Sequence, residues 1–342
     1  MITLAANNPT LGGGEKMLLE LADALRCAGR AVTVVAPEAP GDMVAASRRR
    51  DFPTVALPAS DRPGYLRALR RWDARQREGL LWCGGLVPGL ATAGHPNRIL
   101  HLHQLPQGLH QAVYRISRTG VRAVVVPSQT MARLLPGSRA LPNWSDGLAP
   151  REHLPFGPIV RLGYLGRISV AKGLPTLARA VRLLNDEHPG RFRLALAGEP
   201  RFAPKDDAAA IDEALAPIDA IVDRWGWVDP ERFFADTDLA VFPSASFESF
   251  GLVIAEAMSA RSPFVISDAG AFPEVAGSDH PYVAAAGDAT GLARAVASAA
   301  ATYTEAVLDA AEDRWRRHYS PEAGRARVIR LLDDLGITEG AP

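Results

Sequence analysis

Two short apolar runs in the second half of the chain constrain its fold more than any other feature. Leu239 to Phe242 and Pro263 to Ser267 are each bounded by turn residues, which is typical of buried strands. The segment between them, Gly251 to Ala260, is predicted to be a helix. Because a helix that joins two parallel strands is a crossover, the sequence predicts an α/β domain with a parallel sheet.

The predicted helix carries one charged residue, Glu256, and a glutamate among apolar neighbours is rarely buried without a polar partner. Glu248 lies eight positions earlier, in a serine-rich loop. Ser249, Phe250 and Gly251 then offer backbone N–H groups at the positive end of the helix, where anions bind. A ligand that fits both acids and this helix end needs hydroxyl groups and a phosphate, as a nucleotide sugar has. The alternative is a structural role for the buried acid.

The stretch from Phe242 to Asp268 resembles the signature of family-four retaining glycosyltransferases of the GT-B fold. A serine-rich loop, Glu, Phe-Gly-Leu, a second Glu and Ala-Met follow in the same order. By this resemblance Glu248 contacts the donor sugar, and Glu256 holds the ribose hydroxyls. The amides that approach the donor sugar and its diphosphate belong to Phe250, Gly251 and Leu252.

Three positions depart from the family pattern. Ser249 and Arg261 stand where glycine is common, and Ala271 takes the place of the second glycine in a turn that resembles Gly-Gly-x-Pro-Glu. None of these changes replaces an acid.

Composition limits the class of protein. A chain of 342 residues suits two domains of about 150 residues each. The formal net charge is zero, so a nucleic-acid partner is not indicated. Cys27 and Cys83 are too few for a disulfide framework or a thiolate metal site. The start lacks a signal peptide, and no run reaches the roughly 20 apolar residues of a membrane span, so we expect a soluble cytoplasmic protein.

The first domain is predicted to begin as a strand, a glycine loop, a helix and a second strand. Ile2 to Ala6 is an apolar run, and Gly12 to Gly14 precede apolar residues at helical spacing. The dinucleotide fingerprint requires glycine where Met17 stands, and no Gly-Lys-Ser/Thr ends a P-loop, which disfavours a nicotinamide enzyme. The loop resembles a Gly-Gly-x-Glu element of the family. This resemblance implies donor contacts for Gly13 and Gly14 and acceptor-side positions for Glu15 and Lys16.

Two histidines alternate near the end of a predicted strand, Ile99 to His103. On a strand His101 and His103 share a face, as a metal pair would, but the sequence offers no evident third ligand. The phrase ILHLHQLP resembles the family's strand that ends in histidine before the acceptor loop. The resemblance places His103 near the donor sugar and leaves His101 open.

The segment from Arg48 to Arg77 contains nine arginines and three aspartates, with apolar residues at helical spacing after Pro63. A basic amphipathic helix can dock on anionic lipid, as a peripheral membrane contact, or bind a phosphorylated acceptor. More often such a segment is a solvated face, and from the sequence this is the interpretation that we favour.

In the second domain a predicted strand ends at Gly166, and Arg167 and Lys172 flank the loop to the next helix. A guanidinium and an ammonium in such a loop can neutralise a leaving diphosphate. The spacing resembles the family's Gly-Arg-x-x-x-x-Lys-Gly element, which implies this role for both residues. Resemblance to later loops implies further donor contacts for Gly198, Gly226 and Val228.

Asp236 and Asp238 form an Asp-x-Asp pair of the kind that holds a metal in the other large glycosyltransferase fold, where it ends a strand. Here the pair precedes the strand Leu239 to Phe242. Because ligands of open parallel sheets gather at the carboxyl ends of strands, we interpret the pair as unrelated to a metal site. The expectation is a reaction without a metal or other cofactor.

The predicted architecture is GT-B, with two Rossmann-like doubly wound domains facing across a cleft. Residues 1–145 form an acceptor-side domain, residues 146–317 a nucleotide-sugar-binding domain, and residues 318–342 pack back on the first. The implied reaction moves a sugar from a nucleoside diphosphate to an acceptor hydroxyl with retention, in natural-product (antibiotic) or glycolipid biosynthesis. Two alternatives stay open: a non-catalytic nucleotide-sugar-binding protein, and a glycosidase whose two carboxylates face one bond.

Overall fold

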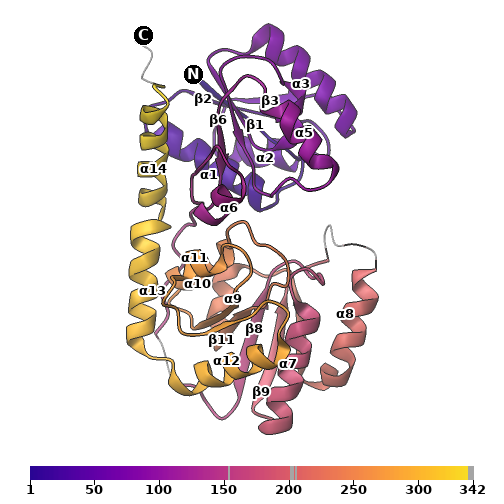
Figure 1. Ribbon diagram of the computed structural model, residues 1–342, viewed down its shortest axis with the longest axis vertical. Coiled ribbons are helices and arrows are strands. Elements are labelled where there is room, and N and C mark those ends of the chain that lie inside the picture. The colour runs from indigo at the N-terminus through magenta and orange to yellow at the C-terminus, as the bar shows by residue number, and fades with distance from the viewer. Residues whose placement is uncertain (153–154, 201–203, 205, 338–342) are drawn as a thin grey trace. The chain divides into compact units, whose positions relative to one another are not determined.

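The computed structural model describes residues 1–152, 155–200, 204 and 206–337. The chain divides into two compact units (Figure 1). Unit 1 consists of Met1–Asn143 and Pro321–Pro342, and unit 2 consists of Trp144–Ser320. The division at residue 145 that the sequence suggested therefore falls at 143, and the C-terminal segment returns to unit 1 from residue 321 instead of 318.

Unit 1 is built on a seven-stranded sheet in which every pair of neighbours is parallel. Its strands, in sheet order, are β3 (Thr54–Leu57), β2 (Val32–Pro37), β1 (Ile2–Ala5), β4 (Leu80–Cys83), β5 (Arg98–His101), β6 (Val121–Val126) and β7 (Ser138–Ala140).

The chain runs from β1 through β2 to β3 and then crosses to β4 on the other side of β1. This reversal assigns the helices of unit 1 to two layers. Crossovers between parallel strands are right-handed, so α1 and α2 cover one face of the sheet and α3 to α6 cover the other. The C-terminal helix α14 packs on α1, as Figure 1 shows. These helices are α1 (Gly13–Cys27), α2 (Asp42–Arg49), α3 (Arg62–Gln76), α4 (Leu86–Ala91), α5 (Leu109–Ser117), α6 (Gln129–Leu134) and α14 (Pro321–Asp334).

Unit 2 has a six-stranded sheet, again parallel throughout. Its strands, in sheet order, are β10 (Val222–Gly226), β9 (Phe192–Ala197), β8 (Val160–Leu165), β11 (Leu239–Phe242), β12 (Phe264–Ser267) and β13 (Val283–Ala284). Its helices are α7 (Leu174–Glu187), α8 (Asp207–Leu215), the 3₁₀ helix η1 (Ala216–Ile221), α9 (Pro230–Asp236), α10 (Leu252–Ser259), α11 (Phe272–Ala276), α12 (Ala289–Thr302) and α13 (Glu305–His318).

The two parallel Rossmann-like sheets confirm the predicted fold class, with small differences at element ends. The strand expected to reach His103 ends at His101, although Leu102 still donates its N–H to Val125. The helix expected from Gly251 starts at Leu252, because Gly251 has a φ of +112°, outside the helical region. Among the described residues, no helix combines the length and the apolar composition needed to cross a bilayer.

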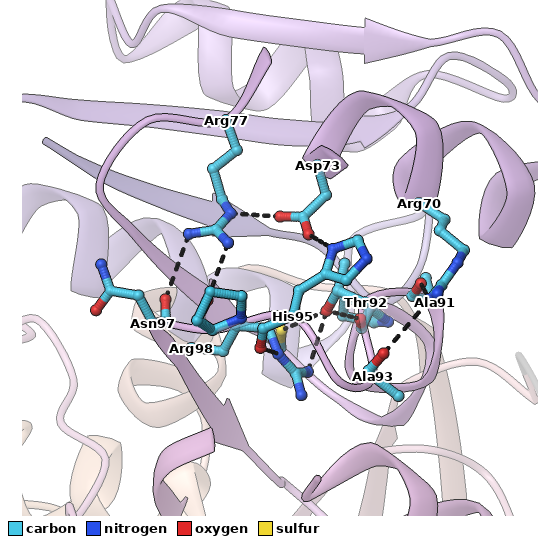
Figure 2. Close-up of polar contacts among 12 residues, drawn as sticks. Arg70, Asp73, Arg77, Ala91, Thr92, Ala93, His95, Asn97 and Arg98 are labelled. Atoms are coloured by element: carbon cyan, nitrogen blue, oxygen red, sulfur yellow. Dashed lines mark hydrogen bonds and ion pairs between the residues drawn. The ribbon is translucent and has the colours of Figure 1, made fainter. Parts of the chain in front are cut away.

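A polar network closes the amino end of the unit 1 sheet, opposite the carboxyl ends where ligands gather in such folds. Figure 2 shows the buried Asp73 between Arg77, with which it forms an ion pair, and the Nδ1 atom of His95, with which it forms a hydrogen bond. Arg77 also donates to the carbonyl oxygens of Gly79 and Pro96, at the entrances of β4 and β5. This network joins the end of α3 to the sheet and is structural.

Arg98 lies fully buried beside this network, and among the described residues no carboxylate is its hydrogen-bond partner. Its guanidinium donates to carbonyl oxygens at Gly89 in α4 and at Ser117, the last residue of α5, and to the Thr92 hydroxyl. Carbonyl groups at helix C-termini carry partial negative charge and lack intrahelical partners. Arg98 therefore anchors the C-terminal ends of two helices.

Candidate active site

The loops after β8 and β11 meet at the carboxyl end of the unit 2 sheet. Backbone N–H groups of Ala245 and Ser246 donate to the carbonyl oxygen of Ala171, over 3.0 and 3.1 Å. Gly173 has a φ of +80°, and a Cβ there would lie 1.8 Å from the carbonyl oxygen of Pro243. Only glycine permits this approach. The glycine after Lys172 thus allows the loop after β8 to pack closely against the loop after β11.

This junction brings the predicted cation and the predicted acid into contact. The Nζ atom of Lys172 lies 2.7 Å from Oε1 of Glu248, with 35% of the lysine side chain and 14% of the glutamate side chain exposed. The same carboxylate oxygen lies 2.5 Å from the Oγ of Ser244, which donates to it. The Ser267 hydroxyl in turn donates to the carbonyl oxygen of Ser244 over 2.7 Å. Lys172, Glu248 and Ser244 are called the charged cluster below.

The backbone of Glu248 is held by the turn after β12. Ala271 donates its N–H to the carbonyl oxygen of Glu248 over 2.8 Å. Gly270 has a φ of +58°, and a Cβ there would lie 2.3 Å from that oxygen. The first glycine of this turn is therefore required by close approach, whereas Ala271 acts through its backbone and tolerates a side chain.

Arg167 lies at the same edge, two residues after β8, and is exposed. Its guanidinium forms no ion pair with a described residue, and the Tyr164 hydroxyl donates to its carbonyl oxygen over 2.5 Å. Burial, with a smaller effect of the Glu248 charge, raises the pKa of Tyr164 far above its ordinary value. The phenol therefore stays a neutral donor that fixes the loop, and the Arg167 side chain is available to a ligand.

Helix α10 presents the second predicted acid. Glu256 is half-buried, on the same partly exposed face of the helix as Leu252, so the sequence expectation of a buried acid is modified. Phe250 is buried with its ring 5.4 Å from that of Tyr319. A Cβ on Gly251 would lie 2.7 Å from the ring of Phe272. Residues 250 and 251 can thus approach a ligand only through their backbone.

The segments at the carboxyl ends of β8, β9 and β10 also converge, and each contains a glycine: Gly166, Gly198 and Gly226. The N–H of Gly198 donates to the carbonyl oxygen of Gly226 over 2.7 Å. A Cβ on Gly198 would lie 1.8 Å from the carbonyl oxygen of Gly166. Val228 is half-buried beyond this contact, and Trp227 beside it is 68% exposed. The predicted donor-side glycines therefore lie together at one sheet edge.

In unit 1 the glycine loop and the histidine loop meet. Gly13 and Gly14 form the first turn of α1, instead of a loop before it, with Gly12 as the N-cap. A Cβ on Gly14 would lie 3.1 Å from the ring of His103. Close packing explains a glycine at 14, while Gly13 is exposed.

Glu15 is buried beside this loop and accepts two hydrogen bonds from Asn8, one from the backbone N–H and one from Nδ2. Burial raises the pKa of Glu15, and the bonds from Asn8 oppose this shift. Asn7 accepts a hydrogen bond from the N–H of Val87, in the first turn of α4, over 3.0 Å. These two asparagines follow β1 after Ala6, and sequence reasoning missed them. Lys16 points to solvent, so the structure does not bring it to Glu15.

His101, the last residue of β5, and His103, two residues beyond it, have ring centroids 4.3 Å apart. Burial lowers the pKa of His103 to about 4. Burial, and then the neighbouring His103, lower the pKa of His101 well below its ordinary value, and Trp82 donates to its Nδ1 over 3.3 Å. Both rings are neutral near pH 7. Among the described residues no group of three or more His, Cys, Asp or Glu could hold a metal ion.

Asp236 and Asp238 lie at the amino end of β11, away from the charged cluster. The carboxylate of Asp238 accepts the backbone N–H of Arg161 over 2.7 Å. Asp236 is exposed and lies 3.4 Å from the Nε of Arg232 in an ion pair. Both acids have local partners within α9 and β8, as expected of structural residues.

Two Rossmann-like units, each with a parallel sheet, are the architecture of the GT-B class of proteins. The model of the glycosyltransferase family 4 domain matches residues 11–143, and that of the glycosyl transferases group 1 domain matches residues 160–302. The chain belongs to this family of glycosyltransferases.

Curated relatives are D-inositol 3-phosphate glycosyltransferases. That of Nocardia farcinica is 34% identical over 43% of this chain and 32% of its own length. That of Mycobacterium marinum is 32% identical over 60% of this chain and 47% of its own length. The chain thus spans between about a third and a half of these relatives.

Solved structures match over nearly the whole chain. A sucrose-phosphate synthase from Thermosynechococcus elongatus has a TM-score of 0.81 at 19% identity, covering 99% of both chains. HepE from Anabaena, in complex with UDP-glucose, has a TM-score of 0.80 at 20% identity, covering 97% of this chain and 99% of its own. At these identities the likeness shows the fold.

Proposed function

We propose that this protein is a retaining glycosyltransferase that moves a sugar from a nucleoside diphosphate to an acceptor hydroxyl. The observation that carries the proposal is the contact between Lys172 and Glu248 at the carboxyl end of the unit 2 sheet. In a donor the diphosphate is joined directly to the sugar. A cation next to an acid suits such a ligand, because the cation can bind the diphosphate and the acid can bind a sugar hydroxyl. Arg167, exposed in the same loop as Lys172, supplies a second positive charge.

Donor binding exchanges the partners within the charged cluster. The diphosphate competes with Glu248 for the ammonium of Lys172, and a fork-shaped guanidinium at Arg167 binds phosphate oxygens in pairs. The carboxylate released from Lys172 accepts a hydroxyl of the donor sugar, while Ser244 keeps it in place. Glu256, half-buried and accessible on α10, accepts the ribose hydroxyls.

The reaction breaks the bond between the anomeric carbon and the phosphate oxygen and forms a bond from that carbon to the acceptor oxygen on the same face. Negative charge grows on the leaving diphosphate, where Arg167 and Lys172 stabilise it. The acceptor proton passes to an oxygen of the leaving phosphate. No side chain is required as a nucleophile. The ring of His103 is neutral near pH 7. It is therefore suited to a hydrogen bond with a sugar hydroxyl and not to an ion pair with a phosphate.

We further propose that the reaction needs no metal ion, because two cationic side chains already face the diphosphate. Turnover in excess chelator tests this part separately. Activity that is lost on chelation and restored by magnesium or manganese would contradict it. The position of Asp236 and Asp238 at the amino end of β11 supports the proposal.

The names of the relatives and neighbours set the order of substrates to test. UDP-glucose is the first donor, since HepE was solved in complex with it. D-inositol 3-phosphate is the first acceptor, since the curated relatives are named for it. Glycolipid and natural-product acceptors, including antibiotic precursors, form the rest of the panel.

The test is a matrix of sugar nucleotides and acceptors, with products followed by mass spectrometry and the anomeric configuration read by NMR. The proposal predicts transfer with retained configuration for one donor and acceptor pair. Inverted product would overturn retention. Nucleotide binding without any transfer would favour the non-catalytic alternative, and cleavage of glycosides that carry no nucleotide would favour a glycosidase.

A further inference from the structure

Positive charge is concentrated on one face of unit 1. Residues 61–134 contain eleven arginines and no lysine against three acids, although the whole chain has a net charge of zero. These residues span α3 to α6, the four helices that cover one face of the unit 1 sheet.

Some of these arginines are structural. Arg77 and Arg98 belong to the network in Figure 2, and Arg70 donates to the carbonyl oxygens of Ala91 and Ala93. These three side chains are therefore engaged in contacts within unit 1.

Other arginines on α3 point to solvent. Arg67, Arg71 and Arg75 are exposed and follow one another at intervals of four, so they form one stripe along the helix. Among the described residues none of the three has an acidic partner. These three arginines are called the basic stripe.

Helix α5 carries the complementary feature. Leu109 is 88% exposed and Ile116 is 53% exposed, and Ala112 and Val113 lie between them at helical spacing. Positions i, i+3, i+4 and i+7 form one side of a helix, which is normally the buried side. Here that side, called the apolar stripe, is largely exposed, and of its four residues only Val113 is half-buried.

The apolar stripe is held in a fixed position. Tyr114 and Ser117 are the two buried residues of α5, and Arg98 binds the carbonyl oxygen of Ser117. Helices α3, α4 and α5 pack against each other in that order, so the two stripes lie on the outer side of one layer. Arg115, on the exposed side of α5, adds a cation next to the apolar stripe.

We propose that this face of unit 1 docks on the surface of an anionic lipid membrane. Amphipathic helices lie in the membrane interface with the apolar side among acyl chains and basic residues at the headgroups. The apolar stripe and the basic stripe supply these two halves. The proposal concerns an interaction surface and does not depend on the transferase reaction.

Two other binding partners would account for only part of this surface. A nucleic acid would account for the arginines but would leave Leu109 and Ile116 exposed. A second copy of the chain that used the same face would bring the same positive charge against itself.

The experiment is co-sedimentation of the full chain with vesicles of phosphatidylglycerol and phosphatidylcholine, compared with pure phosphatidylcholine. We expect binding to the anionic vesicles only, weakening as salt is raised. Replacing Arg67, Arg71 and Arg75 together by serine should weaken binding by on the order of a hundredfold, since each basic residue near an anionic surface contributes roughly fivefold. The matched control replaces Arg48 and Arg49, which are exposed on the opposite face of the same unit.

The apolar stripe is tested by Leu109→Ser with Ile116→Ser, for which we expect roughly a tenfold loss of binding. Ile329→Ser, at an exposed position of α14, is the control. Circular dichroism verifies that each variant is folded. Failure of the parent chain to bind anionic vesicles, or equal loss in the control variants, would overturn the proposal. So would binding of a nucleic acid at the same salt that survives the change at Leu109 and Ile116.

Discussion

The ammonium of Lys172 and the carboxylate of Glu248 lie 2.7 Å apart, although 76 positions separate them in the chain. Two groups that a donor would need are thus each other's partner. The contact lowers the free-energy cost of holding two charges in a partly buried site, because each charge has a partner of opposite sign. It also means that a phosphate must compete with Glu248 for Lys172.

The first prediction follows from this competition. Glu248→Gln removes the negative charge that occupies Lys172, so bare UDP should bind more tightly by roughly 3- to 10-fold. Turnover of the sugar donor should fall by at least about 10-fold, because the sugar loses a charged acceptor. Calorimetry gives the first quantity and a transfer assay the second. Glu187→Gln, at an exposed position of α7, is the control. A loss of UDP affinity in Glu248→Gln would refute the exchange of partners.

The second prediction concerns the ribose. Glu256→Ala should weaken nucleotide binding by roughly 1–3 kcal/mol, because the ribose hydroxyls lose a charged acceptor. Titration with UDP measures the change, with Glu213→Ala on α8 as the control. An unchanged affinity for UDP would remove Glu256 from the proposed site.

The third prediction concerns the end of α10, where Arg261 stands in place of the family's glycine. Its φ is +52°, and its guanidinium lies 2.6 to 2.8 Å from carboxylate oxygens of Glu305, Asp309 and Glu312 on α13. The N–H groups of residues 261 and 262 close the helix in a Schellman motif.

The left-handed backbone costs a residue with a side chain about 1 kcal/mol, and glycine does not bear this cost. Arg261→Ala loses the ion pairs and keeps the strain, so unfolding free energy should fall by roughly 1–2 kcal/mol. Arg261→Gly should be more stable than the alanine variant by about 1 kcal/mol. Urea denaturation measures both, and equal stabilities would show that the backbone strain is not significant.

The fourth prediction is a pH dependence. His280 stacks on Phe264 with ring centroids 4.3 Å apart, and burial lowers its pKa to about 4. In the unfolded chain the pKa of histidine is about 6.5, so between these values the unfolded state binds a proton that the folded state does not. The unfolding free energy therefore falls as pH drops from about 6.5 to about 4, by up to about 1.4 kcal/mol per pH unit for this group.

His280→Phe keeps a stacked ring and cannot bind a proton, so the pH slope of stability should become smaller. Denaturant unfolding at several pH values measures the slope, and His188→Phe, at an exposed position, is the control. A slope that is the same in parent and His280→Phe would contradict the assignment.

The sequence predicted most of the elements that carry the site. The apolar runs at β11 and β12, and the helix between them, were recognisable because buried parallel strands are short and almost purely apolar. Helix α13 was missed, since Glu305–His318 is largely charged and buries only Leu308, Ala311 and Glu312. The burial of Arg98 was also missed, because an arginine at a strand end is normally exposed to solvent.

The contacts of the site were not predictable in the same way. That Lys172 meets Glu248 depends on backbone bonds from residues 245 and 246 to Ala171 and on the close approach at Gly173. Neither leaves a periodic signal in the sequence. The resemblance of the motifs supplied candidate residues, and the structure supplied the pairing of cation and acid.

The central claim is that Arg167 and Lys172 stabilise charge on a leaving diphosphate, and the most direct measurement is turnover of the preferred sugar nucleotide by single alanine variants. Arg167→Ala and Lys172→Ala should each lower turnover by at least about 10-fold. Arg179→Ala, which removes an exposed cation from the same unit, should leave it unchanged. Turnover at the parent rate in both Arg167→Ala and Lys172→Ala would contradict the account.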